Sequence, residues 1–184
     1  MNKDVLVKEV MKTNLVIVQP FTTVFEAARL MKLNKIGDVI ISEVNHPIGI
    51  LTESDVIKKV VCEAKNAQDV LVEEVMSSPI IVTEPYISLQ EALKIMGKCN
   101  IRRLLVIENN KLVGIITQRD ISCLSPILTE IAHEWSSIDT KDEEYLQSQT
   151  FSGKCEDCST LSTSLKSVDG RLLCEDCINQ LKYE

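Results

Sequence analysis

The sequence is poor in several features on which common protein functions depend. Only 6 glycines are scattered through 184 residues, so no glycine-rich loop is available to cradle phosphate groups. No stretch of about 18 apolar residues could cross a bilayer. The first residues do not resemble a signal peptide, and we therefore expect a cytoplasmic protein that makes no membrane contact.

Basic segments and histidines are also scarce. The formal net charge is −7 and no segment is a basic patch, which argues against nucleic-acid binding because that affinity comes mostly from lysine and arginine contacts with phosphate. The two histidines, His46 and His133, lie at no spacing that pairs either of them with a nucleophile. We therefore expect that the protein is not an enzyme.

One segment is present twice. Residues 114–120 read Gly-Ile-Ile-Thr-Gln-Arg-Asp, and residues 49–55 read Gly-Ile-Leu-Thr-Glu-Ser-Asp. The same offset of 65 positions relates Val7 to Val72, Met11 to Met76 and Pro20 to Pro85 without a gap. The first two thirds of the chain are therefore a duplication, and we place its repeats at residues 1–65 and 66–124.

Each repeat is predicted to contain a strand, a helix, two strands joined by a turn, and a second helix. In the first repeat, strands are expected at 15–18, 39–41 and 48–51. Thr23-Val24-Phe25-Glu26 has the spacing of a capping box and opens a helix that reaches about Lys35. The second repeat has strand candidates at 80–82, 104–107 and 112–116 and a helix at 88–98. Such small sheets cannot bury both faces alone, so the repeats are expected to pack sheet against sheet in an α+β fold.

This doubled β-α-β-β-α pattern, with a Gly-hydrophobic-x-Thr-x-x-Asp motif after the last strand of each copy, resembles a tandem pair of cystathionine-β-synthase (CBS) domains. The resemblance covers about two thirds of the chain. It implies a regulatory module that binds an adenosine-containing ligand (AMP, ADP, ATP or S-adenosylmethionine) in the clefts between the repeats. It also implies assembly as a homodimer.

The resemblance assigns roles to individual residues. Thr117 would contact ribose or phosphate, Asp120 would hold the ribose 2′ and 3′ hydroxyls, and Arg102 would reach the phosphate. Ile36 and Gly37, from the other repeat, would line the adenine slot. A pseudo-symmetric second site would use Thr52 and Asp55, with Ile101 and Arg102 on its adenine side.

The same motif has a purely structural interpretation. Thr-x-x-Asp is the spacing of a helix cap that contributes about 1 kcal/mol to stability, and it would recur in a duplicated fold without any ligand.

Charge distinguishes the two sites, because Arg102, Arg103, Lys111 and Arg119 in the second repeat correspond to Gly37, Asp38, His46 and Ser54 in the first. An anionic ligand is therefore expected to prefer the Asp120 site.

The tail carries a second motif. Cys155 and Cys158 form one Cys-x2-Cys pair, Cys174 and Cys177 form another, and 15 residues separate the pairs. This is the spacing of a tetrahedral metal site, with strand candidates at 163–166 and 171–173 forming a hairpin between the pairs. Because a segment this short cannot fold on its own apolar core, metal binding would supply the missing folding energy. Residues 151–184 resemble a zinc ribbon.

Iron and disulfides are the alternatives to zinc. Four thiolates also suit iron, but rubredoxin-like knuckles usually place glycine after the second cysteine of each pair, where this chain has Ser159 and Ile178. Zinc is therefore favoured and iron stays open. Disulfides are disfavoured because the remaining cysteines, Cys62, Cys99 and Cys123, lie in apolar contexts and are interpreted as small buried residues.

Residues 125–150 are expected to link the repeats to the tail. Ser125-Pro126 favours a helix start, and Ile127, Leu128, Ile131, Trp135 and Ile138 follow helical spacing.

From all these elements we hypothesise a sensor in which an adenine nucleotide changes how a zinc ribbon is presented to a protein partner. Two alternatives remain. One is a rubredoxin-like electron-transfer protein on a CBS scaffold, and the other is a nucleic-acid-binding regulator that uses the ribbon, which the acidic tail disfavours.

Overall fold

The computed structural model of the protein describes residues 5–124 and 143–181. The predicted linker helix, with Trp135, lies outside the described residues. None of the helices in these two described ranges is long and apolar enough to cross a membrane.

The first repeat begins with a short 3₁₀ turn, η1 (Val7–Glu9). It contains β1 (Ile17–Val18), α1 (Val24–Asn34), β2 (Asp38–Glu43), β3 (His46–Thr52) and α2 (Glu53–Val56), which continues as the π-helical turn η2 (Ile57–Val61). The predicted capping box is confirmed. The Thr23 hydroxyl accepts a hydrogen bond from the Glu26 N–H at 3.2 Å, and the Glu26 carboxylate accepts one from the Thr23 N–H at 3.4 Å. Lys35 ends α1 in the left-handed conformation, with φ 53°.

The second repeat has the same order of elements. It contains α3 (Val72–Val75), β4 (Ile80–Thr83), α4 (Leu89–Lys98), β5 (Arg103–Glu108), β6 (Lys111–Thr117) and α5 (Gln118–Ser122). Ser88 caps α4 by accepting a hydrogen bond from the Glu91 N–H at 3.2 Å. One face of α4, which includes Ala92 and Met96, is buried against the sheet. The strands and the helix predicted for this repeat are confirmed.

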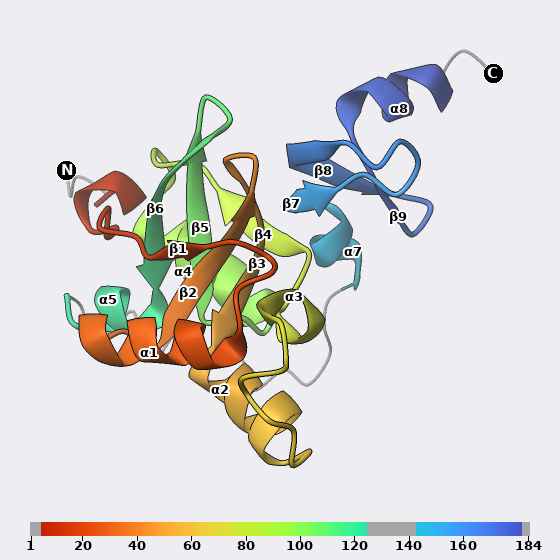
Figure 1. Ribbon diagram of the computed structural model, residues 1–184. Helices are drawn as coiled ribbons and strands as arrows, with labels where there is room; N and C mark the ends of the chain where they lie inside the picture. Colours follow the sequence, from red (N-terminus) through yellow and green to blue (C-terminus); the bar gives the residue numbers. More distant parts are fainter. Residues whose placement is uncertain (1–4, 125–142, 182–184) are drawn as a thin grey trace.

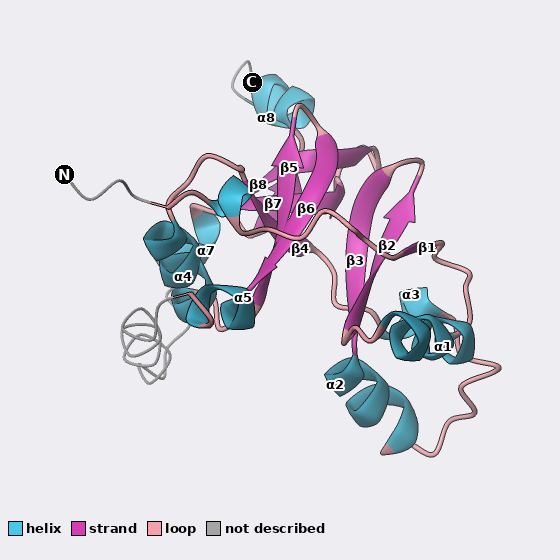
Figure 2. Cartoon of the chain, turned by 90° about the vertical axis from the view of Figure 1, so that its left-hand side faces the viewer, coloured by secondary structure: helices cyan, strands magenta, loops and turns pink. Residues whose placement is uncertain are grey.

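The two sheets face each other, as predicted. In each repeat the first strand runs parallel to the second, which is antiparallel to the third. Their inner faces share one core, formed by Ile40, Ile50, Ile80, Val82, Leu105, Ile107 and Ile115. Figure 2 shows the sheets side by side, with α1 and α2 beside one and α4 and α5 beside the other.

The tail extends the second sheet. After α7 (Glu143–Gln147), the chain forms β7 (Thr150–Lys154), β8 (Leu161–Val168), β9 (Arg171–Leu173) and α8 (Glu175–Leu181). We call residues 150–181 the four-cysteine module. Its first strand, β7, pairs antiparallel with β4, with Phe151 opposite Ile81, so the sheet has the order β6-β5-β4-β7-β8-β9 (Figure 1). The sequence predicts β8 and β9 as a hairpin but does not predict β7.

The module shares the core of the second repeat. Phe151, Leu165 and Leu173 belong to the same cluster of buried residues as Leu93 and Leu104. Polar contacts also tie the module to the first repeat. The hydroxyl of the fully buried Ser152 donates a hydrogen bond to the Pro47 carbonyl, and Lys154 forms an ion pair with Glu43 at 2.9 Å.

Candidate functional site

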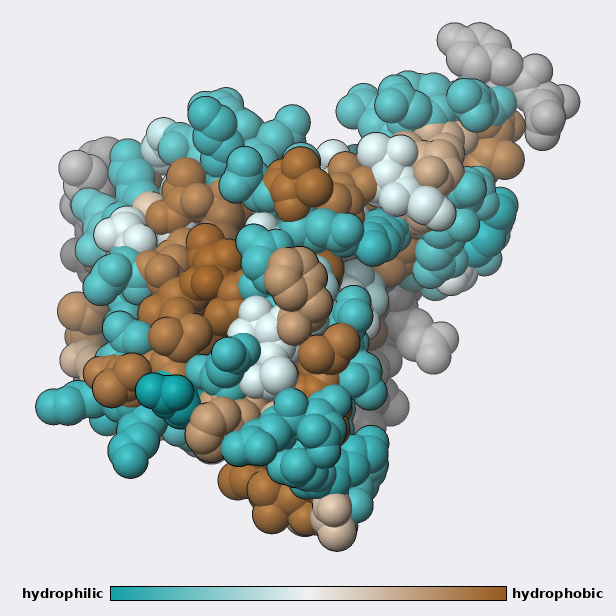
Figure 3. Space-filling view, viewed as in Figure 1, coloured by the Kyte–Doolittle hydropathy of each residue, from teal (hydrophilic) through white to brown (hydrophobic). Residues whose placement is uncertain are grey.

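A cleft of about 1350 Å³ lies between the two repeats. Its apolar lining comes from the segment before β1, the end of α1 and the inner strands, and it includes Leu15, Val16, Ile36, Ile40 and Ile115. Both copies of the repeated motif reach it through Thr52 and Thr117. Figure 3 shows hydrophobic surface gathered over the region of β1, β2 and β6. Two sites that the sequence suggests separately therefore open into one cavity.

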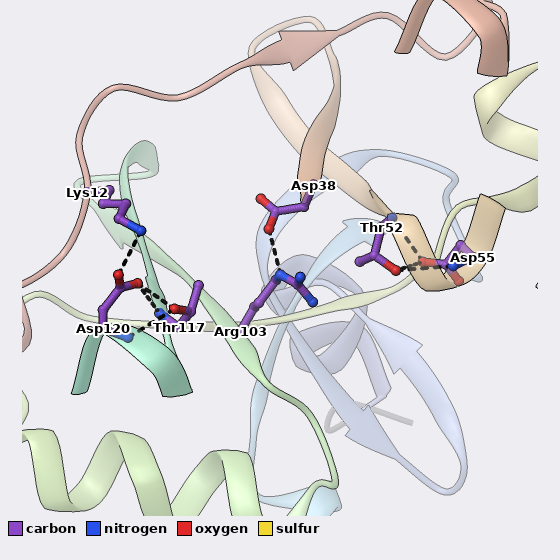
Figure 4. A network of polar contacts seen from close by, with 7 residues as sticks. All are labelled: Lys12, Asp38, Thr52, Asp55, Arg103, Thr117 and Asp120. Atoms are coloured by element: carbon purple, nitrogen blue, oxygen red, sulfur yellow. Dashed lines mark hydrogen bonds and ion pairs between the residues drawn. The ribbon is translucent and has the colours of Figure 1, made fainter. Parts of the chain in front are cut away.

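The second copy of the motif forms a compact polar cluster. Thr117 precedes α5, where its N–H donates to Asp120 Oδ2 at 3.0 Å and its hydroxyl accepts from the Asp120 N–H at 3.2 Å. The other carboxylate oxygen of Asp120 forms an ion pair with Lys12 Nζ at 2.7 Å (Figure 4). Burial raises the pKa of Asp120, but the hydrogen bonds from Lys12 and Thr117 outweigh it and hold the pKa below its ordinary 3.8.

The first copy is built in the same way with a different lysine. The Thr52 N–H donates to Asp55 Oδ2 at 3.0 Å, and Lys59, one turn further along the helix, pairs with Asp55 Oδ1 at 3.0 Å. The Ser77 hydroxyl donates to the same oxygen at 3.2 Å. Burial raises the pKa of Asp55, but the hydrogen bonds from Thr52 and Lys59 lower it by more than burial raises it. The pKa of Asp55 therefore also lies below 3.8. The helix-cap interpretation is thus met at both sites, and both carboxylates are ionised at neutral pH.

Basic side chains outnumber acidic ones around the cleft. Among its lining residues are Lys12, Lys32, Lys35, Arg102, Arg103 and Arg119, against Asp38 and Glu53. Since the whole chain carries a net charge of −7, this is a local concentration of positive charge. Of these groups, Lys12 is paired with Asp120 and Arg103 with Asp38, and the surplus of positive charge that remains favours the approach of an anionic ligand.

One of the basic residues predicted to lie around the second motif, Lys111, does not line the cleft, and neither does its first-repeat counterpart, His46. Lys111 lies opposite Glu108 at the turn between β5 and β6, and His46 lies opposite Glu43 at the corresponding turn between β2 and β3. Each is at the opposite end of its strand from the threonine of the motif. The three lysines of the cleft are not predicted from the sequence, because they lie outside the motif, in the segment before β1 and at the end of α1.

Of the eight predicted ligand-binding residues, five line the cleft. These are Ile36, Gly37, Thr52, Arg102 and Thr117. Asp55 and Asp120 are bonded directly to the two threonines. Ile101 instead packs against the buried core of the second repeat.

Asp38 and Arg103 form an ion pair in the cleft. Asp38 is the first residue of β2 and Arg103 is the first residue of β5. Arg103 Nε lies 2.6 Å from Asp38 Oδ2, and the two side chains are 30% and 18% exposed, respectively. Figure 4 shows the pair between the Thr52–Asp55 and Thr117–Asp120 clusters.

The four cysteines of the tail converge on one point. Cys155 Sγ and Cys177 Sγ are 3.8 Å apart, Cys158 Sγ and Cys174 Sγ are 3.7 Å apart, and all four lie within 4.8 Å of one another. Four thiolates at about 2.3 Å from a tetrahedral ion would be about 3.8 Å apart, so the spacing fits zinc or a similar ion.

Local structure prepares Cys155 to be a thiolate. Its sulfur accepts a hydrogen bond from the Cys174 N–H at 3.3 Å. Burial raises the pKa of Cys155, but backbone N–H groups of its own turn (Asp157 and Cys158) and of Cys174 outweigh this effect and lower the pKa to about 6. Of the three remaining cysteines, which are expected to be buried, Cys99 is buried, but Cys62 and Cys123 are exposed.

Comparison with known proteins agrees with the duplicated architecture. The CBS domain family matches residues 7–62 and 72–124. An uncharacterized protein from Methanopyrus kandleri is 36% identical to this chain, over 97% of it and 93% of the relative. The hexameric CBS-CP12 protein from bloom-forming cyanobacteria is 31% identical, with a TM-score of 0.61, and the match covers 64% of this chain and 66% of that one.

One solved structure resembles nearly the whole chain. A CBS domain protein from Thermoplasma acidophilum superposes with a TM-score of 0.64 over 92% of each chain. At 23% identity this likeness shows a shared fold alone. The family match itself ends at residue 124, before the four-cysteine module.

Proposed function

Because the chain belongs to the CBS domain family, we propose that it is a regulatory protein whose ligand, an adenosine-containing compound, binds in the cleft between its two repeats. AMP, ADP, ATP and S-adenosylmethionine are the candidate ligands. The observation that carries the proposal is the single cleft into which both threonine motifs open, with its surplus of basic side chains. The proposal includes no catalytic step.

The chemistry of the cleft suits the parts of a nucleotide. Its apolar lining, which includes Ile36 and Ile115, can bury a base, and the absence of a side chain at Gly37 leaves room beside it. The ionised carboxylates of Asp120 and Asp55 can accept hydrogen bonds from ribose hydroxyls. Arg102 and the other basic groups can pair with phosphate oxygens.

We further propose that the four-cysteine module is a zinc ribbon. The sulfur spacing supports a tetrahedral ion, and the ion would hold the tail together because the module has few buried apolar residues of its own. Ser159, the residue after the first cysteine pair, adopts the left-handed backbone conformation with φ 58°. Rubredoxin-like iron sites usually have glycine in this conformation at the same position. Metal analysis and the visible spectrum decide the element, since zinc tetrathiolate is colourless and ferric tetrathiolate is not.

The sheet connects the two sites. Thr117 ends β6, Cys155 follows β7, and both strands belong to the same six-stranded sheet. A ligand that binds two arrangements of the repeats with different affinity would therefore also change how the module is presented to a protein partner. In this proposal the protein is a cytoplasmic homodimer. Each chain consists of two repeats (residues 1–65 and 66–124), a linker (125–150) and the ribbon (151–184).

Thermal unfolding tests the ligand proposal. The purified protein and Asp120→Ala are heated with AMP, ADP, ATP, NAD or S-adenosylmethionine, each at high concentration. A ligand at about 100 times its dissociation constant stabilises by about 2.7 kcal/mol, and each kcal/mol moves the midpoint by about 2–4 °C in a chain of this size. We expect a shift with at least one ligand and a smaller shift in Asp120→Ala. If no compound shifts either protein, the ligand proposal is wrong.

A further inference from the structure

Asp38 and Arg103 occupy the same position in the two repeats. They are related by the offset of 65 that relates the two copies of the motif, and they begin the equivalent strands β2 and β5. Two residues related by a twofold repeat can touch only near the axis that relates the repeats. Their ion pair of 2.6 Å therefore marks the middle of the cleft, and Figure 4 shows it between the two threonine–aspartate clusters.

We infer that Arg103 selects ligands that carry phosphate, and that it does so by exchanging Asp38 for the anionic group of the ligand. This inference rests on the proposed function, because it assigns the charge selectivity of the same cleft. Asp38 then sets how much negative charge a ligand needs in order to bind well.

The geometry leaves Arg103 able to bind an anion. Asp38 engages Nε, and a guanidinium has five N–H donors, so donors remain for a second acceptor. Both side chains line the cleft and are partly exposed, which makes the pair accessible to a bound molecule. Gly37 contributes space, since a β-carbon there would lie 3.7 Å from Arg103 Nη2 and 3.3 Å from Glu53 Oε2.

The charges of Asp38, Arg103 and the ligand phosphate explain why the phosphate would displace Asp38. While Asp38 holds Arg103, much of the positive charge at the centre of the cleft is neutralised, and the carboxylate repels any phosphate that approaches. A phosphate is a stronger bidentate partner for a guanidinium than a single carboxylate oxygen is, so it can displace Asp38. A neutral ligand such as adenosine has no group that competes for Arg103, and it leaves the pair intact.

Two variants with opposite expected effects test the inference. Binding of AMP and of adenosine is measured by calorimetry on the full chain, on Asp38→Asn and on Arg103→Met. Arg103→Met should weaken AMP binding about tenfold, the effect of losing one charge-assisted hydrogen bond, and Asp38→Asn should strengthen it several-fold. Adenosine binding should change by less than twofold in both variants, and this also reports that both remain folded.

Matched controls come from an exposed ion pair outside the cleft. Glu63 and Lys65 lie 2.6 Å apart and do not line the cleft, so Glu63→Gln and Lys65→Met change the net charge by the same amounts as the two test variants. They should leave AMP affinity within about twofold of the parent, because exposed charges are screened over roughly 10 Å.

The outcomes separate the inference from the proposed function. If AMP binds and Asp38→Asn leaves its affinity unchanged or lowers it, Asp38 does not compete and the inference is wrong. The same holds if Arg103→Met weakens adenosine as much as AMP, or if the control variants match the test variants. If neither AMP nor adenosine binds any of the proteins, the inference is wrong, whereas the proposed function is lost only if thermal unfolding also shows no shift with the other candidate ligands.

Discussion

Met11 lies so close to Gly114 that a β-carbon on the glycine would be 2.6 Å from the methionine sulfur. The equivalent pair, Met76 and Gly49, is tighter still, at 2.1 Å. Each methionine thus covers the repeated motif of the other repeat. Backbone bridges between Lys12 and Ile115, and between Ser77 and Ile50, hold the two crossing segments in place. The glycine that opens the motif is therefore explained by packing between repeats.

Replacing this glycine should destabilise the fold. Gly114→Ala inserts a methyl group against the Met11 sulfur and the Lys12 carbonyl, and overpacking of this kind costs about 1–3 kcal/mol. Urea unfolding measures the loss. Gly153→Ala is the control, because its nearest neighbours would be 3.6 Å away and an effect within about 0.5 kcal/mol is expected. Met11→Ala combined with Gly114→Ala should cost less than the sum of the single changes, and additivity would contradict the contact.

The ion pair between Lys12 and Asp120 predicts a response to acid. A carboxylate with a lowered folded-state pKa stabilises the protein above its unfolded value, here 3.8, and that contribution is lost as the pH falls through the folded pKa. Between pH 7 and pH 3, Asp120→Asn should therefore lose less stability than the parent protein. Urea unfolding at several pH values checks this. Identical pH profiles for the two proteins would show that the pairing of Asp120 does not contribute to stability.

Removing the proposed metal should affect more than the tail. Chelation, or the variant Cys155→Ser, should loosen the four-cysteine module and raise hydrogen exchange in β7. Because β7 pairs with β4, exchange in Ile80–Thr83 should rise as well. Cys62→Ser is the control, since Cys62 is exposed and lies outside the cluster. Exchange that rises in β8 and β9 but in neither β7 nor β4 would mean that β7 stays paired without the metal.

The contacts of β7 should differ in strength. Phe151→Ala removes a buried ring from the core shared with the second repeat and should cost about 3 kcal/mol. Lys154→Met breaks an ion pair whose side chains are 58% and 38% exposed and should cost under about 1 kcal/mol. Thermal unfolding compares the two variants with the parent. Equal losses would show that the module is held mainly by surface charge.

The sequence predicts best where the signal is local. The capping box at Thr23, the alternation of elements and the four-cysteine spacing each depend on residues close in the chain, and the structure contains all of them. The duplication also predicts that the sheets pack together, because each needs a partner for its second face. Lys111 is placed at the site wrongly, because the offset of 65 fixes equivalence between repeats but not which end of a strand faces the cleft.

What the sequence could not predict depends on contacts between distant segments. Lys12 reaches Asp120 across more than a hundred residues, and nothing near either residue signals the pair. β7 is short and includes polar residues such as Ser152, so its periodicity is weak. Its place is set by the unpaired edge of β4 and by the Pro47 carbonyl, which are known only once the sheets are assembled.

The pairing of β7 with β4 also bears on how the chain avoids self-association. β1 and β4 are equivalent outer strands of the duplicated unit, and an open strand edge is a template for fibril-like stacking between molecules. β1 is only two residues long and is soon followed by Pro20, which limits such growth. β4 is longer and reads Ile-Ile-Val-Thr, a run of high β-propensity, and β7 occupies its edge. By pairing with β4, the tail covers a strand edge that would otherwise be open to such stacking.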